Sequence, residues 1–180
     1  MRQVRNLSPP TRFLVNKTVN FTDPALDQQI AEICRALQQP EWERFKITPE
    51  GSYAIRLTND TGAVSVKGSI VTASRTVDNA VVLQNNEFDA FGVILEDGIP
   101  NGGDVWVVIA GRAQVLLADT TACTRGQLFI CSPVDGRALV IANPGDGLPA
   151  VETHFKELGH CTESVVAGVN KLAWAVVHFN

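Results

Sequence analysis

The sequence has few aromatic residues and lacks any long hydrophobic run. Aromatic residues make up 7% of its 180 residues, and charged residues make up 19%. No stretch is apolar for long enough to cross a bilayer, so we expect no membrane partner. The basic opening, MRQVRNLSPPTRFLVNKTVNF, is not followed by the apolar segment of a signal peptide. We therefore expect the protein to be made in the cytoplasm and to stay in that cell until lysis.

The sequence also lacks a recognisable set of catalytic residues. A nucleophilic site needs a serine or cysteine beside a histidine and an acid. His160 and Cys161 are adjacent, but neighbours in a strand point to opposite faces. No serine lies in a GxSxG context. We therefore predict that the protein is not an enzyme, although a small all-β hydrolase remains an alternative.

Signatures of metal and phosphate binding are missing as well. The three histidines, His154, His160 and His178, have spacings that match no common ligand pattern. The glycine-rich segments 102–103 and 145–147 lack the lysine of a phosphate-binding loop and precede no helix. We predict no metal site and no cofactor.

The four cysteines, Cys34, Cys123, Cys131 and Cys161, form no CxxC pair. Each has apolar or small neighbours in the sequence. Buried free thiols are therefore a better interpretation than disulfides or a metal site.

The charge is unevenly distributed. Residues 1–22 contain four basic and no acidic side chains, whereas the remaining 158 residues carry a formal charge of −8. An acidic body argues against direct nucleic-acid binding by the main domain. The basic leader is either a solvated tail or a segment that contacts nucleic acid or an acidic protein surface.

The first fifty residues predict an arm and one helix. Pro9 and Pro10 exclude a helix over residues 1–22, so this segment should be extended. Asp23 and Pro24 then begin an amphipathic helix, which ends at Pro40, and residues 41–46 could add one further helical turn. The apolar stripe of this helix, which should dock on its own domain or on another subunit, is formed by Leu26, Ile30, Ile33 and Leu37.

From residue 51 onward the pattern predicts strands. Short β-rich runs such as YAIRLT, DVWVVIA and RAQVLLA are separated by turn residues, and AVSVKGSIVTAS alternates around Gly68. Asp135-Gly136 is the clearest hairpin signal. We predict a mainly β protein of about ten strands, an antiparallel β-barrel or sandwich over residues 51–180 that follows an arm-and-helix region over residues 1–50.

One phrase occurs twice. GVILEDGIPNGGDVWVVIAG begins at Gly92, and GHCTESVVAGVNKLAWAVVHFN begins at Gly159. Each copy predicts a strand, a tight turn and a second strand, which suggests internal duplication. The glutamates of the two copies, Glu96 and Glu163, form either a paired carboxylate site or, as we prefer, rim residues near turn amides. Trp106 and Trp174 are expected to pack in the core or at a subunit interface rather than to stack on sugars.

The segments containing these phrases resemble the head decoration (capsid cement) proteins of tailed bacteriophages. The resemblance covers roughly residues 52–180 and excludes residues 1–50. It rests on turn glycines, a DGRA hairpin and apolar strands: Gly92, Leu95, Glu96, Gly126, Asp135-Gly136-Arg137, Gly159, Glu163, Ala167-Gly168 and the final strand.

The resemblance implies a structural virion protein on the outer capsid surface, often a homotrimer, that bridges subunits of the major capsid protein. On that basis we expect the arm to bind the shell through Arg2, Arg5, Arg12, Phe13 and Lys17. We expect subunit contacts at the helical stripe and at Trp106 and Trp174. A glycan- or receptor-binding β-domain of the virion, with these tryptophans exposed, is the alternative.

Overall fold

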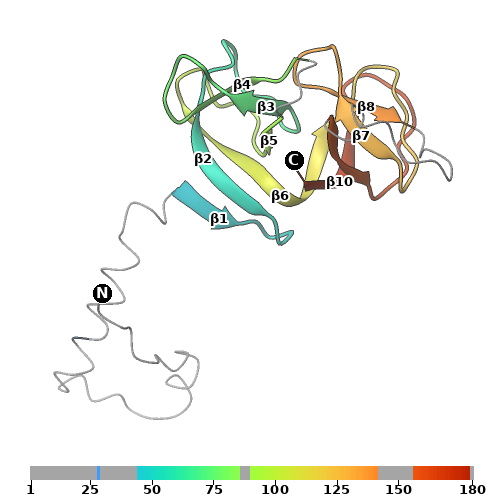
Figure 1. Cartoon of the computed structure of the whole chain (residues 1–180), viewed down its shortest axis with the longest axis horizontal. Coiled ribbons are helices and arrows are strands. Elements are labelled where there is room, and N and C mark those ends of the chain that lie inside the picture. The colour runs from blue at the N-terminus through green and yellow to red at the C-terminus, as the bar shows by residue number, and fades with distance from the viewer. Residues whose placement is uncertain (1–27, 29–43, 86–89, 142–155, 179–180) are drawn as a thin grey trace. The chain divides into compact units, whose positions relative to one another are not determined.

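The computed structural model describes residues 28, 44–85, 90–141 and 156–178. Every regular element in these ranges is a β-strand, which confirms the prediction of a mainly β protein (Figure 1). The chain divides into two units between residues 39 and 40, and the ten strands found in the described ranges all belong to the second unit. Apart from Gln28, which is helical, the predicted arm and helix lie outside the described residues. Within the described ranges, no helix combines the length and the hydrophobicity needed to cross a membrane.

The strands follow one another at short intervals along the chain. Their bounds are β1 Phe45–Ile47, β2 Tyr53–Asn59, β3 Ile70–Ala73, β4 Ala80–Leu83, β5 Gly92–Ile94, β6 Asp104–Leu116, β7 Leu128–Cys131, β8 Ala138–Ile141, β9 Glu157–Cys161 and β10 Leu172–His178.

Five of these strands close a barrel. The order is β2-β4-β3-β5-β6, and β2 pairs with β6 to complete the ring. The prediction of an antiparallel barrel is wrong in one respect, because β2 and β4 run parallel, with Thr58 opposite Ala80. The reason is geometric: strand direction can alternate around a closed ring only if the number of strands is even. A ring of five must contain one parallel pair.

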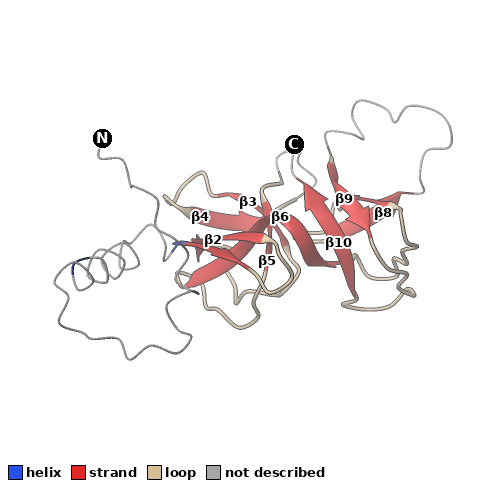
Figure 2. Cartoon of the chain, turned by 90° about the horizontal axis from the view of Figure 1, so that it is seen from below, coloured by secondary structure: helices blue, strands red, loops and turns tan. Residues whose placement is uncertain are grey.

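The remaining strands repeat this arrangement outside the barrel. We call β2–β5 with the start of β6 the first half, and the end of β6 with β7–β10 the second half. In the second half the order is β6-β10-β9-β7-β8. Its parallel contact is reduced to a single bridge between Leu117 and Ala138. Figures 1 and 2 show β6 crossing from one half to the other.

β6 is a single strand of 13 residues, although the sequence predicted two strands on either side of Gly111. Gly111 has a φ of +102°, and a Cβ at this position would lie 2.9 Å from Ser52. The glycine therefore allows a close approach to β2 without ending the strand. As a result, one continuous strand serves both halves.

The start of the described sheet also differs from expectation. Residues 45–47 form β1, which pairs antiparallel with β2, whereas the sequence predicted a helical turn over residues 41–46. The ring of Phe45 stacks on that of Tyr53 at 5.8 Å, and Lys46 lies over the ring of Trp106. These tertiary contacts outweigh a weak local helical preference. The predicted strand around Gly68 is likewise shorter, since only residues 70–73 are extended.

Each half forms main-chain hydrogen bonds that have an equivalent in the other half. Leu95 N donates to Trp106 O at 2.9 Å, and at the equivalent place Thr162 N donates to Trp174 O at 2.8 Å. Equivalent turns of the two halves also have left-handed backbone. The four equivalent pairs, with the residue of the first half given first, are Gly62 and Thr120, Gly68 and Gly126, Asn79 and Gly136, and Gly102 and Asn170. The repeated phrase is thus the visible part of a structural duplication that includes every strand from β2 to β10.

Steric crowding explains why each copy of the phrase begins with a glycine. A Cβ on Gly92 would collide with Val107 and with the carbonyl oxygen of Val108. A Cβ on Gly159 would collide with the backbone of Val176 and Val177, the equivalent place on β10. In both halves the neighbouring strand passes too close for any side chain.

Candidate functional site

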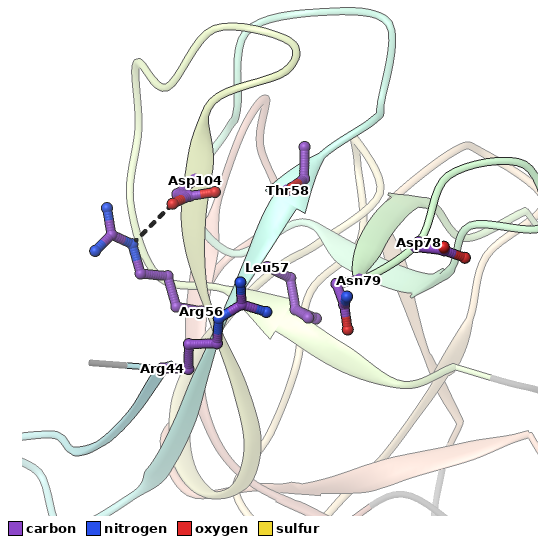
Figure 3. Close-up of a pocket in the computed structure, with 7 residues that line it drawn as sticks. All are labelled: Arg44, Arg56, Leu57, Thr58, Asp78, Asn79 and Asp104. Carbon is purple, nitrogen blue, oxygen red and sulfur yellow. Dashed lines mark ion pairs between the residues drawn. The ribbon is translucent and has the colours of Figure 1, made fainter. Parts of the chain in front are cut away.

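An open, polar groove lies in the first half, beside the junction of β2 and β6. It has a volume of about 310 Å³ and is lined by Arg44, Arg56, Leu57, Thr58, Asp78, Asn79 and Asp104 (Figure 3). Arg56 turns toward Asp104, with Nε 3.3 Å from Oδ2, and both side chains are about half exposed. An ion pair in this setting contributes little to stability.

The chemistry of this groove suits contact with polar groups of another molecule. Among the described residues that line it, none is a histidine or a cysteine. Two arginines and two aspartates of mixed sign give no strong preference for an anion or a cation. A groove of this composition fits the polar rim of a protein–protein contact better than an enclosed ligand site.

Trp106 and Trp174 occupy equivalent positions in the two halves, and both are partly buried. Trp106 packs against the larger of two buried clusters, which includes Val93, Val115 and Phe129. A cation covers one face of each ring: Lys46 Nζ is 4.2 Å from the centre of Trp106, and Arg112 Cζ is 4.4 Å from that of Trp174. This arrangement leaves less of each ring available as a platform for a sugar.

The two glutamates of the repeated phrase lie at the rim of their own halves. Glu163 Oε1 accepts a hydrogen bond from Trp174 N at 2.8 Å, so its carboxylate lies near a main-chain amide as we expected, but this amide belongs to β10 and not to the turn. The main-chain oxygen of Glu96 accepts a bond from Ser65 Oγ at 2.8 Å. Each glutamate thus belongs to the framework of its own half.

Three cysteines fall in the described ranges, and all three are buried thiols that form no disulfide, as predicted. The Sγ atoms of Cys123 and Cys161 are 3.1 Å apart. Burial, followed by the hydrogen bond with Cys161, raises the pKa of the Cys123 thiol to about 12. A thiol with this pKa stays protonated at neutral pH and is a poor nucleophile.

The described residues bring together one group that could hold a metal ion, formed by Glu157, His160 and His178. Sequence spacing missed this group, because the three residues come from two strands and one of those strands carries a bulge.

The predicted shell-binding residues Arg2, Arg5, Arg12, Phe13 and Lys17 lie outside the described residues. The same is true of the helical stripe formed by Leu26, Ile30, Ile33 and Leu37. These residues stay predictions. Comparison with known protein families and with curated proteins finds no match.

Proposed function

We propose that this protein is a decoration protein of a tailed-bacteriophage head, located on the outer surface of the virion. In this function it binds the assembled icosahedral shell and bridges neighbouring subunits of the major capsid protein. The observation that carries the proposal is the resemblance of the two repeated segments and the DGRA hairpin to proteins of that class. A cement protein needs neither catalytic residues nor a cofactor.

The resembling residues are mainly framework residues, so the proposal locates the binding surfaces elsewhere. Gly136 has a φ of +68°, and a Cβ there would lie 2.9 Å from Leu83. Gly126 has a φ of +86° at the turn before β7. Such positions preserve a fold and leave the exposed side chains free to diverge.

An exposed apolar edge supports a function based on contacts between chains. β1 stands at one end of the strand order. On β1 and its neighbour β2, the exposed fractions are 36% for Phe45, 63% for Ile47 and 49% for Tyr53. Apolar side chains along a terminal strand favour pairing with another chain. In the sequence, this edge comes shortly after the predicted helix, whose apolar stripe we expect to make subunit contacts.

The proposed stabilisation follows from mass action. A ligand that binds only the assembled lattice lowers the free energy of that lattice relative to its free subunits. In a homotrimer, three weak attachments act together through a high effective concentration. An arm that becomes ordered on binding loses entropy but spans a seam between subunits.

Deletion of residues 1–22 tests the attachment proposal. Heads of the phage that encodes the protein are incubated with the full-length chain, with the deletion, or with a chain in which Arg2, Arg5, Arg12 and Lys17 are replaced by glutamine. We expect both altered chains to bind the heads at least about tenfold more weakly, with less dependence on salt, because exposed charge pairs are screened. Unchanged binding by both would contradict the role of the arm.

A further inference from the structure

Three potential metal ligands meet on one face of the second half. Nε2 of His160 and Nε2 of His178 each lie 3.2 Å from Oε1 of Glu157. The two imidazole rings are tilted by 41°, with centroids 5.7 Å apart. The three ligand atoms all lie within 4.8 Å of one another.

Strand pairing explains how the two histidines share a face. His160 of β9 lies opposite Val176 of β10. Because alternate residues of a strand point to the same side, His178 faces the same way as Val176 and therefore the same way as His160. The 17 residues between the two histidines, 161–177, contain the turn and most of the strand that bring them together.

A β-bulge accounts for the position of Glu157. In a regular strand, residues 157 and 160 would point to opposite faces. On β7, however, Phe129 pairs with Gly159 and the next residue, Ile130, pairs with Glu157, so Leu158 is an extra residue. Gly159, with a φ of +138°, follows this extra residue. The bulge re-aims the carboxylate to the side of the histidines.

The exposed histidine side chains make this cluster accessible to ions from the solvent. The side chain of Glu157 is 9% exposed, whereas those of His160 and His178 are 52% and 44% exposed. The enclosed carboxylate attracts a cation more strongly than a solvated one would. The imidazoles border solvent, so an ion can enter without rearrangement of the core.

Two of the three separations between ligand atoms match those around a small transition-metal ion. With metal–ligand bonds of about 2.0–2.1 Å, a tetrahedral site holds its ligand atoms about 3.3 Å apart. Both nitrogen–oxygen separations are 3.2 Å. Two imidazoles and one carboxylate are ligands that Zn²⁺ accepts, and three protein ligands leave one position for water. We propose that Glu157, His160 and His178 bind one divalent transition-metal ion of the Zn²⁺ class.

Comparison with the first half shows that the fold does not require these residues. The pairing that places His160 opposite Val176 in the second half places Val93 opposite Val108 in the first. Val93 is 1% exposed and belongs to the larger buried cluster. The residues equivalent to the three ligands are Ala90, Val93 and Ala110, none of which can bind a metal. The ligand set is therefore an addition to the shared framework.

Titration of the full-length, untagged chain with zinc chloride tests the site. Isothermal calorimetry should show saturable binding of one ion per chain. His160→Ala and His178→Ala should each weaken binding by at least about tenfold, since even the loss of a residue that only orients a ligand costs that much. Val176→Ala is the matched control, because this exposed residue lies on the same face and offers no ligand atom. It should bind as the unaltered chain does.

A second readout uses the unaltered protein and does not depend on how the variants fold. Diethyl pyrocarbonate should modify both exposed histidines, and zinc should protect them, as measured by mass spectrometry of the peptides. Lack of zinc binding by the unaltered chain, or lack of protection, would show that the histidines only hydrogen-bond to Glu157, and would overturn the proposal. Equal binding by the His160→Ala/His178→Ala double variant would do the same. These outcomes are independent of attachment to capsids.

Discussion

The two halves of the sheet have the same strand pairing but fill their interiors differently. The smaller buried cluster lies within the first half and consists of Val71, Val81, Ile94, Val105 and Val107. At the equivalent positions the second half has Phe129, Ala138, Cys161, Ala173 and Ala175, all of which are also buried. At these five positions the second half thus has one large aromatic ring and four small side chains, whereas the first half has five side chains of medium size. Packing density constrains the combined volume of a core, and the identity of each residue follows from its neighbours.

The halves also close differently. In the first half, two residue pairs join β2 to β4, and the buried side chain of Asn59 donates to Ala63 O and Ile99 O, each at 2.9 Å. In the second half the residue equivalent to Asn59 is Leu117, and only one bridge remains. There Arg137 donates to Leu117 O at 2.9 Å and to Asn170 Oδ1 at 2.6 Å. A partly buried guanidinium thus replaces a fully buried amide.

The largest effect should come from removing the ring on which the second core depends. Phe129→Ala should lower the free energy of unfolding by about 3–5 kcal/mol, because it removes the largest of the fully buried side chains and leaves a cavity. The equivalent change in the first half, Val71→Ala, should cost about 2 kcal/mol, from the loss of buried methyl groups and the small cavity that remains. Chemical denaturation of both variants measures the difference. If both variants lost the same free energy of unfolding, the second core would not depend on one large ring as we infer.

A smaller effect should follow from opening the second half. Arg137→Ala removes the bonds to Leu117 O and Asn170 and the ion pair with Asp119, and should cost about 1–3 kcal/mol. The matched control is Arg56→Ala, which removes an exposed ion pair and should cost at most about 1 kcal/mol. If both variants lose the same stability, Arg137 does not hold the second half closed.

The smallest effect should come from making one position of the second half like the first. Cys123 is equivalent to Ser65: both side chains bond to the main-chain oxygen of the phrase glutamate, Glu163 and Glu96 respectively. Cys123→Ser should therefore change stability by less than about 1 kcal/mol near neutral pH, since a hydroxyl can make the same bond. A loss of several kcal/mol would show that this loop is not equivalent in the two halves.

The same variant has a pH signature. Because the pKa of Cys123 is raised from 9.0 to about 12 in the folded protein, the thiol contributes stability that is complete below pH 9 and is lost as pH rises toward 12. The Cys123→Ser protein should lose less stability than the parent over that range. Parallel denaturation curves at neutral and alkaline pH measure this difference.

The sequence predicted the class of the fold and part of the duplication, but not how the barrel closes. Alternation and turn chemistry identified the strands and the Asp135-Gly136 hairpin, because these are local properties. The parallel contact between β2 and β4 depends on the number of strands in the ring, and no local pattern contains that number. In the sequence, Gly111 suggested that one strand ends there and another begins. Its actual role is to let neighbouring backbone pass close by, and this role is visible only once β2 lies beside β6.

The candidate sites were hidden for related reasons. The repeated phrase covers only the last two strands of each half, and the equivalence of the others appears only in their hydrogen bonds. Glu157, His160 and His178 have no metal-binding spacing, because a bulge and a cross-strand pair set their geometry. Local periodicity cannot predict a residue that a bulge turns to the opposite face.

Co-sedimentation with phage heads tests the central claim, that this protein acts by binding an assembled shell. The full-length chain is mixed with expanded heads that lack it, with unexpanded heads, and with free major capsid protein. We expect saturable binding to the expanded heads and little binding to the other two, together with greater resistance of the decorated heads to heat. A chain that stays in the supernatant in all three mixtures would contradict the account.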